Sequence, residues 1–111
     1  MPNPLDRLGE FEQMVLLAVI ASGDQAYAVP VRQEIERIST RAVSRGAVYV
    51  TLDRLVEKGY LASRLGDATP ERGGRPKRFY HVTPLAVRTL KESRRVLELL
   101  WSAADATLRR T

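Results

Sequence analysis

Few side chains of this sequence are suited to catalysis or to metal binding. The 111 residues include no Cys and one His, which excludes disulfides, thiolate metal sites and Cys nucleophiles. His81 lies in a segment expected to be a strand, and no pattern of Ser or carboxylate residues places a nucleophile beside it. A single His also falls short of the usual zinc ligand set. We therefore expect no catalytic residue, no metal and no cofactor, and the sequence argues against an enzyme.

The cations carry the clearest chemical signal. The chain has 18 Lys and Arg against 13 Asp and Glu, a net charge of +5, and its pI is about 10.1. Residues 1–40 carry three Arg and six acids, whereas residues 41–111 carry fifteen cations and seven acids, so the balance changes from −3 to +8. Such a separation within a chain of single-domain length indicates a face that binds a polyanion, either nucleic acid or an anionic membrane. A generally basic, solvated surface is the alternative.

Residues 44–58 predict a helix with an unusual outward face. Ser44 can cap its N-terminus and Gly59 can end it. On a helical wheel of about 100° per residue, the core side holds Val48, Leu52, Leu55 and Val56. The opposite side holds Gly46, Ala47, Val50 and Arg54, flanked by Tyr49 and Thr51. A helix exposed only to solvent would carry Glu, Lys or Gln there, so these residues indicate contact with another surface.

This outward face has the composition of a helix that reads DNA. The major groove admits an α-helix with its N-terminal residues nearest the base edges. Apolar side chains there contact thymine methyl groups, hydroxyl groups suit phosphate oxygens, and Arg reaches a phosphate or a base edge. The helix N-terminus itself favours an anion. The expected DNA-binding residues of this helix and its entrance are Arg41, Ser44, Arg45, Ala47, Tyr49, Val50, Thr51 and Arg54.

A second group of cations lies in a loop rich in Gly and Pro. The segments 60–65 and 78–82 have the aromatic and β-branched residues typical of strands, and residues 66–77 between them have turn chemistry. The loop and its exit hold Arg72, Arg75, Lys77 and Arg78 within seven residues that contain no acid. We expect a β-hairpin whose loop places these cations on phosphates or in the minor groove. A solvated loop without a partner is the alternative.

The order of the expected elements predicts the fold class. Helices are expected from Leu5 to Ala21, around Pro30 to Ile38, from Ser44 to Lys58, and, after the hairpin, for about 25 residues from Pro84 to Arg109. Three helices followed by a hairpin form a winged helix-turn-helix. The fold is thus mainly α (α+β), with three helices, a β-hairpin wing and a long C-terminal helix. We expect residues 1–83 to bind DNA and residues 84–111 to dimerise.

The last helix is too widely apolar to be covered by one small domain. Its apolar residues span about 200° of the wheel, against about 100° for a helix packed on one core. The second surface is most simply the same helix or the first helix of another subunit, in a C2 homodimer. The expected interface residues are Leu97, Leu100, Trp101, Ala104 and Leu108. Trp101, the only Trp of the sequence, is expected to pack in this interface.

The apolar segments do not indicate a membrane protein. The longest run, Met14 to Ala21, has eight residues, and a bilayer requires about 18–20. No basic leader with a cleavage site precedes it, and the last helix lacks the cationic flank of an interfacial anchor. We expect a soluble, cytoplasmic protein with no membrane partner.

Several of these segments together resemble a known family. They are Gly9–Glu12, Leu16–Leu17, Ala26–Ala28, Gly46–Leu61 and Gly73–Thr83. In combination they resemble the PadR family of bacterial winged-helix transcription regulators, in its small subgroup with a single C-terminal helix. The chain departs from the family pattern at Ala28 and at Pro84–Ala86. The resemblance implies a homodimeric, usually repressing regulator in which Tyr49 and the wing touch DNA and the last helix dimerises. Since interface tryptophans of some small members stack on flat aromatic ligands, the resemblance also implies that Trp101 lines a pocket for a small aromatic effector. Packing in the interface without a ligand is the alternative.

Two hypotheses of different classes follow. The first is a sequence-specific regulator of double-stranded DNA, a homodimeric repressor on a palindromic operator, released by a small-molecule effector. Its half-sites would lie about 34–36 Å apart. The alternative is a winged-helix protein-interaction module whose long helix docks a partner protein. A salt-sensitive shift of palindromic DNA that random DNA does not abolish distinguishes the first from the second.

Overall fold

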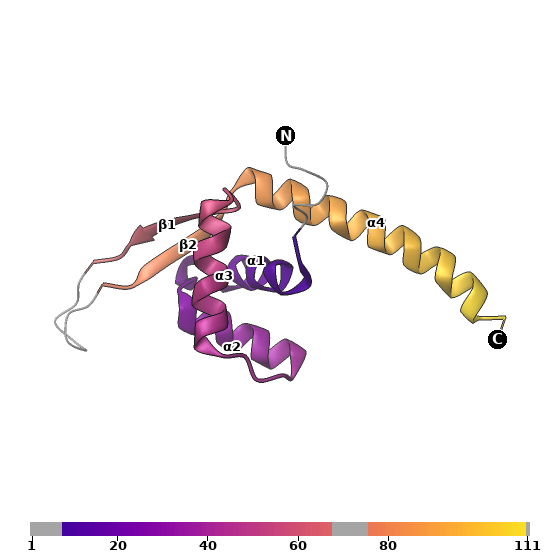
Figure 1. Cartoon of the computed structure of the whole chain (residues 1–111), viewed down its shortest axis with the longest axis horizontal. Coiled ribbons are helices and arrows are strands. Elements are labelled where there is room, and N and C mark those ends of the chain that lie inside the picture. The colour runs from indigo at the N-terminus through magenta and orange to yellow at the C-terminus, as the bar shows by residue number, and fades with distance from the viewer. Residues whose placement is uncertain (1–7, 68–75, 111) are drawn as a thin grey trace.

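The computed structural model, which describes residues 8–67 and 76–110, is a mostly helical chain with one antiparallel hairpin (Figure 1). Its elements are α1 (Glu10–Ser22), η1 (Gly23–Gln25), α2 (Ala28–Ser39), α3 (Arg45–Glu57), β1 (Leu61–Leu65), β2 (Arg78–Val82) and α4 (Pro84–Leu108). The predicted order and fold class are confirmed. The helix expected from Leu5 begins at Glu10 instead, because Gly9 is its N-cap and Leu8 is not helical. Leu5 itself and the wing residues Arg72 and Arg75 lie outside the described residues.

The predicted helix boundaries after residue 40 follow from local chemistry. The Ser44 hydroxyl accepts a hydrogen bond from the Ala47 N–H at 3.1 Å and caps α3. Thr83 caps α4 in the same way, and Pro84 occupies the first helical position, where no backbone donor is needed. Gly59 has φ +82°, a conformation that Gly adopts without strain, and it turns the chain from α3 into β1.

The core lies where α1 meets α2, α3 and the hairpin. The side chains excluded from solvent are Val15, Leu16, Val19, Val31, Val48, Leu52 and Leu55. The predicted core side of α3 is therefore confirmed for three of its four residues, and Val56 packs partly buried against the core. The apolar surface of α1 is not fully covered within the described chain, because Leu17 and Ile20 are 54% and 46% exposed.

Backbone hydrogen bonds attach the hairpin to the helices. The strands pair from Leu61 opposite Val82 to Leu65 opposite Arg78. The Tyr80 N–H donates to the carbonyl of Ala26 at 2.8 Å, so the segment before α2 lies along β2. The direction in which the wing leaves the body is thus fixed at its base.

The hairpin and α4 leave the helical body on opposite sides (Figure 1). The first part of α4 packs on the body through buried Ala86 and Leu90. Beyond Ser93, whose hydroxyl bonds to the Gln13 amide oxygen at 3.2 Å, the helix projects outward, and the molecule measures 62 × 35 × 22 Å. None of the helices in the described ranges has the length and apolar character needed to cross a membrane.

An ion pair between Glu12 and Lys58, which we call the Glu12–Lys58 bracket, connects the start of α1 to the end of α3. Glu12 is 8% exposed, accepts a hydrogen bond from the Gly9 N–H at 2.9 Å and pairs with the Lys58 Nζ at 3.0 Å. Burial alone would raise the pKa of Glu12, but the Gly9 N–H and the Lys58 ammonium outweigh burial, so the pKa lies below its ordinary value of 4.5.

We predict that Glu12→Gln lowers the free energy of unfolding by about 1 kcal/mol, a modest figure because solvent screens the partly exposed Lys58. A lowered folded-state pKa means that this stabilisation is complete above pH 4.5 and disappears as the pH falls through the folded pKa. Denaturant unfolding from pH 7 to pH 3 measures it. Glu57→Gln, an exposed change on α3, is the control. A difference from wild type that does not shrink as the pH falls would contradict the bracket.

Candidate nucleic-acid interface

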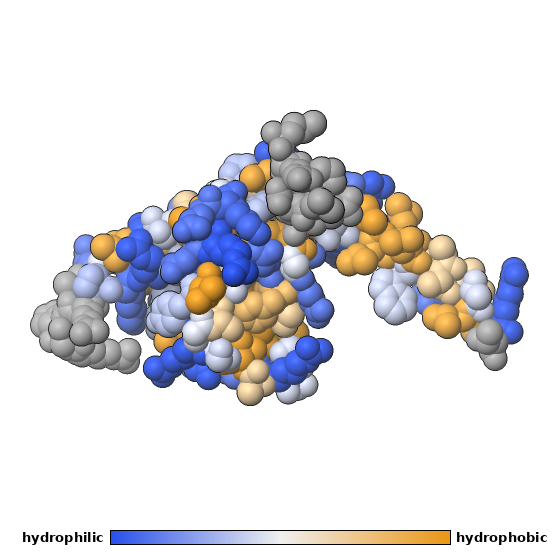
Figure 2. All heavy atoms as spheres, in the orientation of Figure 1, coloured by the Kyte–Doolittle hydropathy of each residue, from blue (hydrophilic) through white to orange (hydrophobic). Residues whose placement is uncertain are grey.

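The outward face of α3 is open to solvent over its whole length. Tyr49 and Val50 are 50% and 57% exposed. Gly46, Ala47 and Arg54 are also exposed. Figure 2 shows mainly hydrophilic residues over α3, with few apolar ones among them. The predicted exposure of this face is confirmed for these five residues, and its small first turn allows close approach to another surface.

Thr51 does not belong to this face, contrary to its expected position beside it. Its exposed fraction is 6%, and it lies with the core residues of α3. On the wheel Thr51 falls about 60° from Val48, closer than Val56 at about 80°. The same periodicity that located the core could therefore have placed Thr51 inside.

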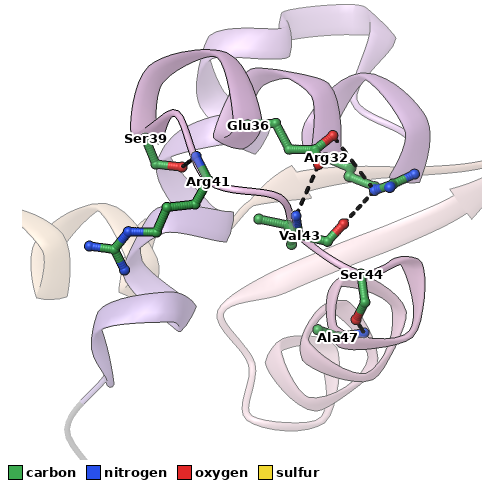
Figure 3. Close-up of polar contacts among 7 residues, drawn as sticks. All are labelled: Arg32, Glu36, Ser39, Arg41, Val43, Ser44 and Ala47. Atoms are coloured by element: carbon green, nitrogen blue, oxygen red, sulfur yellow. Dashed lines mark hydrogen bonds and ion pairs between the residues drawn. The ribbon is translucent and has the colours of Figure 1, made fainter.

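The entrance of α3 presents two exposed cations and a hydroxyl. Arg41 and Arg45 flank Ser44, and all three residues are exposed. The Arg41 guanidinium points away from the α2–α3 contact (Figure 3). Ser44 accepts the capping hydrogen bond from Ala47, but its own O–H remains a donor that suits a phosphate oxygen. The entrance can therefore hold an anion without breaking the helix cap.

A stack of cations and aromatic rings forms the base of the wing. The Lys77 Nζ lies 4.3 Å from the centre of the Tyr27 ring, and the Arg64 guanidinium lies 4.8 Å from the centre of the Phe79 ring. The two rings meet edge to face at 5.6 Å. A Cβ at Gly66 would lie 2.6 Å from the Phe79 ring, so Gly allows this packing.

Tyr27 and Arg64 are functional candidates that the sequence reasoning missed. Arg64 lies opposite Phe79 in the strand register, and Tyr27 comes from the segment before α2. These residues come together only through contacts between different elements. The one sequence signal that could have indicated the site is a cation and an aromatic residue, Arg64 and Phe79, in the two expected strands. The exposed Arg78 adds its guanidinium, which donates to the Ser63 hydroxyl at 3.1 Å.

The cations of this region have no ion-pair partner among the described carboxylates. No described carboxylate forms an ion pair with Arg41, Arg45, Arg54, Arg64, Lys77 or Arg78. By contrast, Arg37 pairs with Glu34, Arg94 with Glu98, and Arg95 with Glu92. Unpaired cations retain their full charge for an external anion. No group of metal ligands occurs within the described ranges.

A winged helix-turn-helix with an exposed, small-residue recognition helix and unpaired cations defines a DNA-binding protein. The model of the transcriptional regulator PadR-like family matches residues 16–92, more than half of the chain. The chain belongs to this family. It is a DNA-binding transcriptional regulator and not an enzyme. This favours the DNA-binding regulator of the first hypothesis over a protein-interaction module.

Solved structures share this fold at low sequence identity. A PadR-like transcriptional regulator from Bacillus cereus matches with a TM-score of 0.67 and 18% identity over 88% of this chain and 90% of that one. A PadR family transcriptional regulator from Eggerthella lenta matches with a TM-score of 0.66 and 20% identity, over 92% of this chain and 88% of that one. MarR from E. coli matches with a TM-score of 0.54 and 22% identity, over 80% of this chain and 56% of that one. No curated protein matches the chain.

The wing-base stack gives a prediction about stability. Tyr27→Leu keeps an apolar side chain but removes the edge-to-face pair and the cation–π contact, so it should lower the free energy of unfolding by about 1 kcal/mol. Tyr49→Leu, the same change at a half-exposed residue, should alter it by less than about 0.5 kcal/mol. Urea denaturation measures both. Equal effects of the two substitutions would contradict a structural role for the stack.

Proposed function

We propose that this protein is a homodimeric repressor that binds a palindromic operator in double-stranded DNA. The observation that carries the proposal is the exposed α3 face beside cations without acidic partners. Residues 1–83 are the DNA-binding domain, and residues 84–111 form the dimerisation helix. A dimer seated on its operator excludes other proteins from the same DNA, which suffices for repression.

In this proposal the first turns of α3 enter the major groove. Ala47 and Val50 contact thymine methyl groups, and the Tyr49 hydroxyl and Arg54 reach phosphates or base edges. Arg41, Ser44 and Arg45 bind phosphates at the helix entrance. The wing cations Arg72, Arg75, Lys77 and Arg78, joined by Arg64, bind the neighbouring backbone or the minor groove.

Selection of bound sequences from a random DNA pool tests the proposal directly. A recovered palindrome with half-site centres one duplex turn apart, about 34–36 Å, would support both DNA reading and two-fold symmetry. Recovery of no common sequence by the full chain at low salt would contradict it.

Substitutions on α3 test which side chains contact the DNA. Tyr49→Ala and Arg54→Ala should each weaken operator binding about tenfold or more, because each removes a contact of about 1–3 kcal/mol without disturbing the core. Tyr49→Phe separates the hydroxyl from the ring. Fluorescence anisotropy with labelled operator measures the affinities, and unchanged values for both Ala variants would contradict the assignment.

The wing is tested by salt dependence. Lys77→Gln removes one phosphate contact per subunit, so the log–log slope of affinity against salt should become shallower by about 2 for a dimer. Lys91→Gln carries the same charge change on α4, away from the proposed interface, and should leave the slope within about 0.5 of wild type. Equal slopes for wild type and Lys77→Gln would remove Lys77 from the contact surface.

The dimer proposal rests on the uncovered continuation of one helix face. Ala86 and Leu90 are buried against the body, and helical spacing of three, four and seven residues continues that face outward. The residues that continue it are Leu97, Leu100, Trp101, Ala104 and Leu108, and the four large ones are 51–62% exposed. Figure 2 shows apolar residues along this part of α4. So large an apolar face on one helix indicates a partner surface.

A second copy of the chain offers the required apolar surfaces. A hollow of about 590 Å³ lies between the start of α1 and α4 and reaches Leu97 and Leu100. The exposed Leu17 and Ile20 on α1 add apolar surface on the body. Either α4 or α1 of the second subunit can therefore cover the helix. Trp101 packs in this interface, and a flat aromatic effector that stacks on it would alter the same contact.

Trp101→Ala and Leu100→Ala should each weaken dimerisation about tenfold or more, since an aromatic or Leu anchor at an interface is worth about 2 kcal/mol. Leu99 is similarly exposed at 59% but lies on the opposite side of α4, so Leu99→Ala is the matched control. Sedimentation velocity over a concentration series measures the dimer. Equal effects of Leu99→Ala and Leu100→Ala would contradict an interface on this face.

A further inference from the structure

Two side chains of α2 hold the backbone just before α3. The Arg32 Nε donates to the carbonyl of Val43 at 2.6 Å, and the Val43 N–H donates to the Glu36 Oε2 at 2.9 Å. The other carboxylate oxygen of Glu36 lies 3.8 Å from the Arg32 Nε. Figure 3 shows the three residues facing one another, directly before the cap residue Ser44.

We propose that Arg32 and Glu36 are positioning residues that fix where α3 begins and how its first turn faces DNA. We call Arg32, Glu36 and the Val43 backbone the turn clamp. The inference rests on the proposed DNA-binding function and assigns to it two residues that do not themselves read DNA. The clamp holds both polar groups of Val43, and a backbone held through both its donor and its acceptor has little freedom to rotate.

The order of the two charges argues against a simple helix-surface ion pair. An acid placed four residues before a cation is the more favourable arrangement on a helix, whereas here Arg32 precedes Glu36. Both side chains are only about one-third exposed, at 33% and 31%. Their bonds to Val43 span eleven and seven residues, so what they stabilise is the connection between two helices.

The turn has few other hydrogen bonds, although the partly buried side chain of Val43 also packs against the core. Its first residue, Thr40, has φ 58°, and its N–H bonds to the Glu36 carbonyl at the end of α2. The next N–H, that of Arg41, bonds to the Ser39 hydroxyl at 3.3 Å. The clamp is thus the remaining polar link between α2 and Val43. One residue later, Ser44 caps α3, so a shift of Val43 would move the cap and the first turn together.

Arg32 also lies next to the reading surface. It lines a hollow of about 220 Å³ between α2 and α3 together with Arg45 and Tyr49. Its guanidinium is occupied by Glu36 and the Val43 carbonyl, unlike the unpaired cations of the interface. The clamp therefore acts on the part of α3 that meets the DNA, through contacts made within the protein.

Whether a substitution of Glu36 weakens or tightens DNA binding distinguishes a positioning role from a purely electrostatic one. Glu36→Ala removes a negative charge near the DNA, and charge alone would tighten binding. The turn clamp predicts the reverse: operator affinity about tenfold weaker, with affinity for random DNA within about twofold of wild type, because phosphate attraction needs no exact helix position. Glu34→Ala is the matched control, with the same charge change on α2 at a carboxylate that pairs with Arg37.

Glu36→Gln keeps an acceptor for the Val43 N–H and should recover at least half of the lost operator affinity on a logarithmic scale. All measurements use the full chain at a temperature where unfolding curves show each variant folded. Operator binding by Glu36→Ala as tight as that by Glu34→Ala would overturn the proposal.

A second readout does not depend on DNA. Amide hydrogen exchange at Val43 and Ala47 should be at least fivefold faster in Glu36→Ala than in Glu34→Ala, while the Leu52 and Leu55 amides exchange alike in both. Equal exchange at Val43 and Ala47 would overturn the clamp. If the wild type selects no DNA sequence but the exchange difference is present, the proposed function fails while the clamp stands.

Discussion

The packing of α3 on α1 is the interaction on which the rest of the structure depends. Val48, Leu52 and Leu55 are excluded from solvent, and each buried side chain of this size contributes about 1.5–3 kcal/mol. Because the core uses only this side of α3, the opposite side stays exposed to solvent among the described residues. The Glu12–Lys58 bracket anchors one end of the helix, and the turn clamp anchors the other.

Charge is distributed in keeping with this division. Cations that stabilise the protein are paired with carboxylates, as Lys58 is with Glu12 and Arg32 with Glu36. The cations of α3 and of the wing base rest against aromatic rings or solvent. The net charge of +5 therefore includes a group of cations, at α3 and the wing base, that no described carboxylate pairs.

Much of the fold follows from the sequence because its signals are local. Capping by Ser44 and Thr83, the φ of Gly59 and the core spacing of α3 depend on neighbours within a few residues. Thr51 lies on the core side of α3 by its angle, although its hydroxyl is typical of a DNA-contacting residue. The Tyr27–Phe79 stack and the bonds from Arg32 and Glu36 to Val43 join residues 7–52 positions apart, and no periodicity reports such pairs. The exposed side of α1 could not be predicted from its sequence either, because it depends on which side the rest of the chain covers.

The junction between β2 and α4 has a mechanical consequence. Thr83 is the one residue between Val82 and Pro84, and its hydroxyl and N–H are both bonded back to residues 59 and 60. The winged helix-turn-helix, called the head below, is therefore joined to α4 without a hinge. The 25 helical residues of α4 extend about 37 Å. In the proposed dimer this helix sets both the distance and the relative rotation between the two winged-helix domains. One residue added within it would rotate the head by about 100° about the helix axis and bring the two recognition helices out of phase with the duplex.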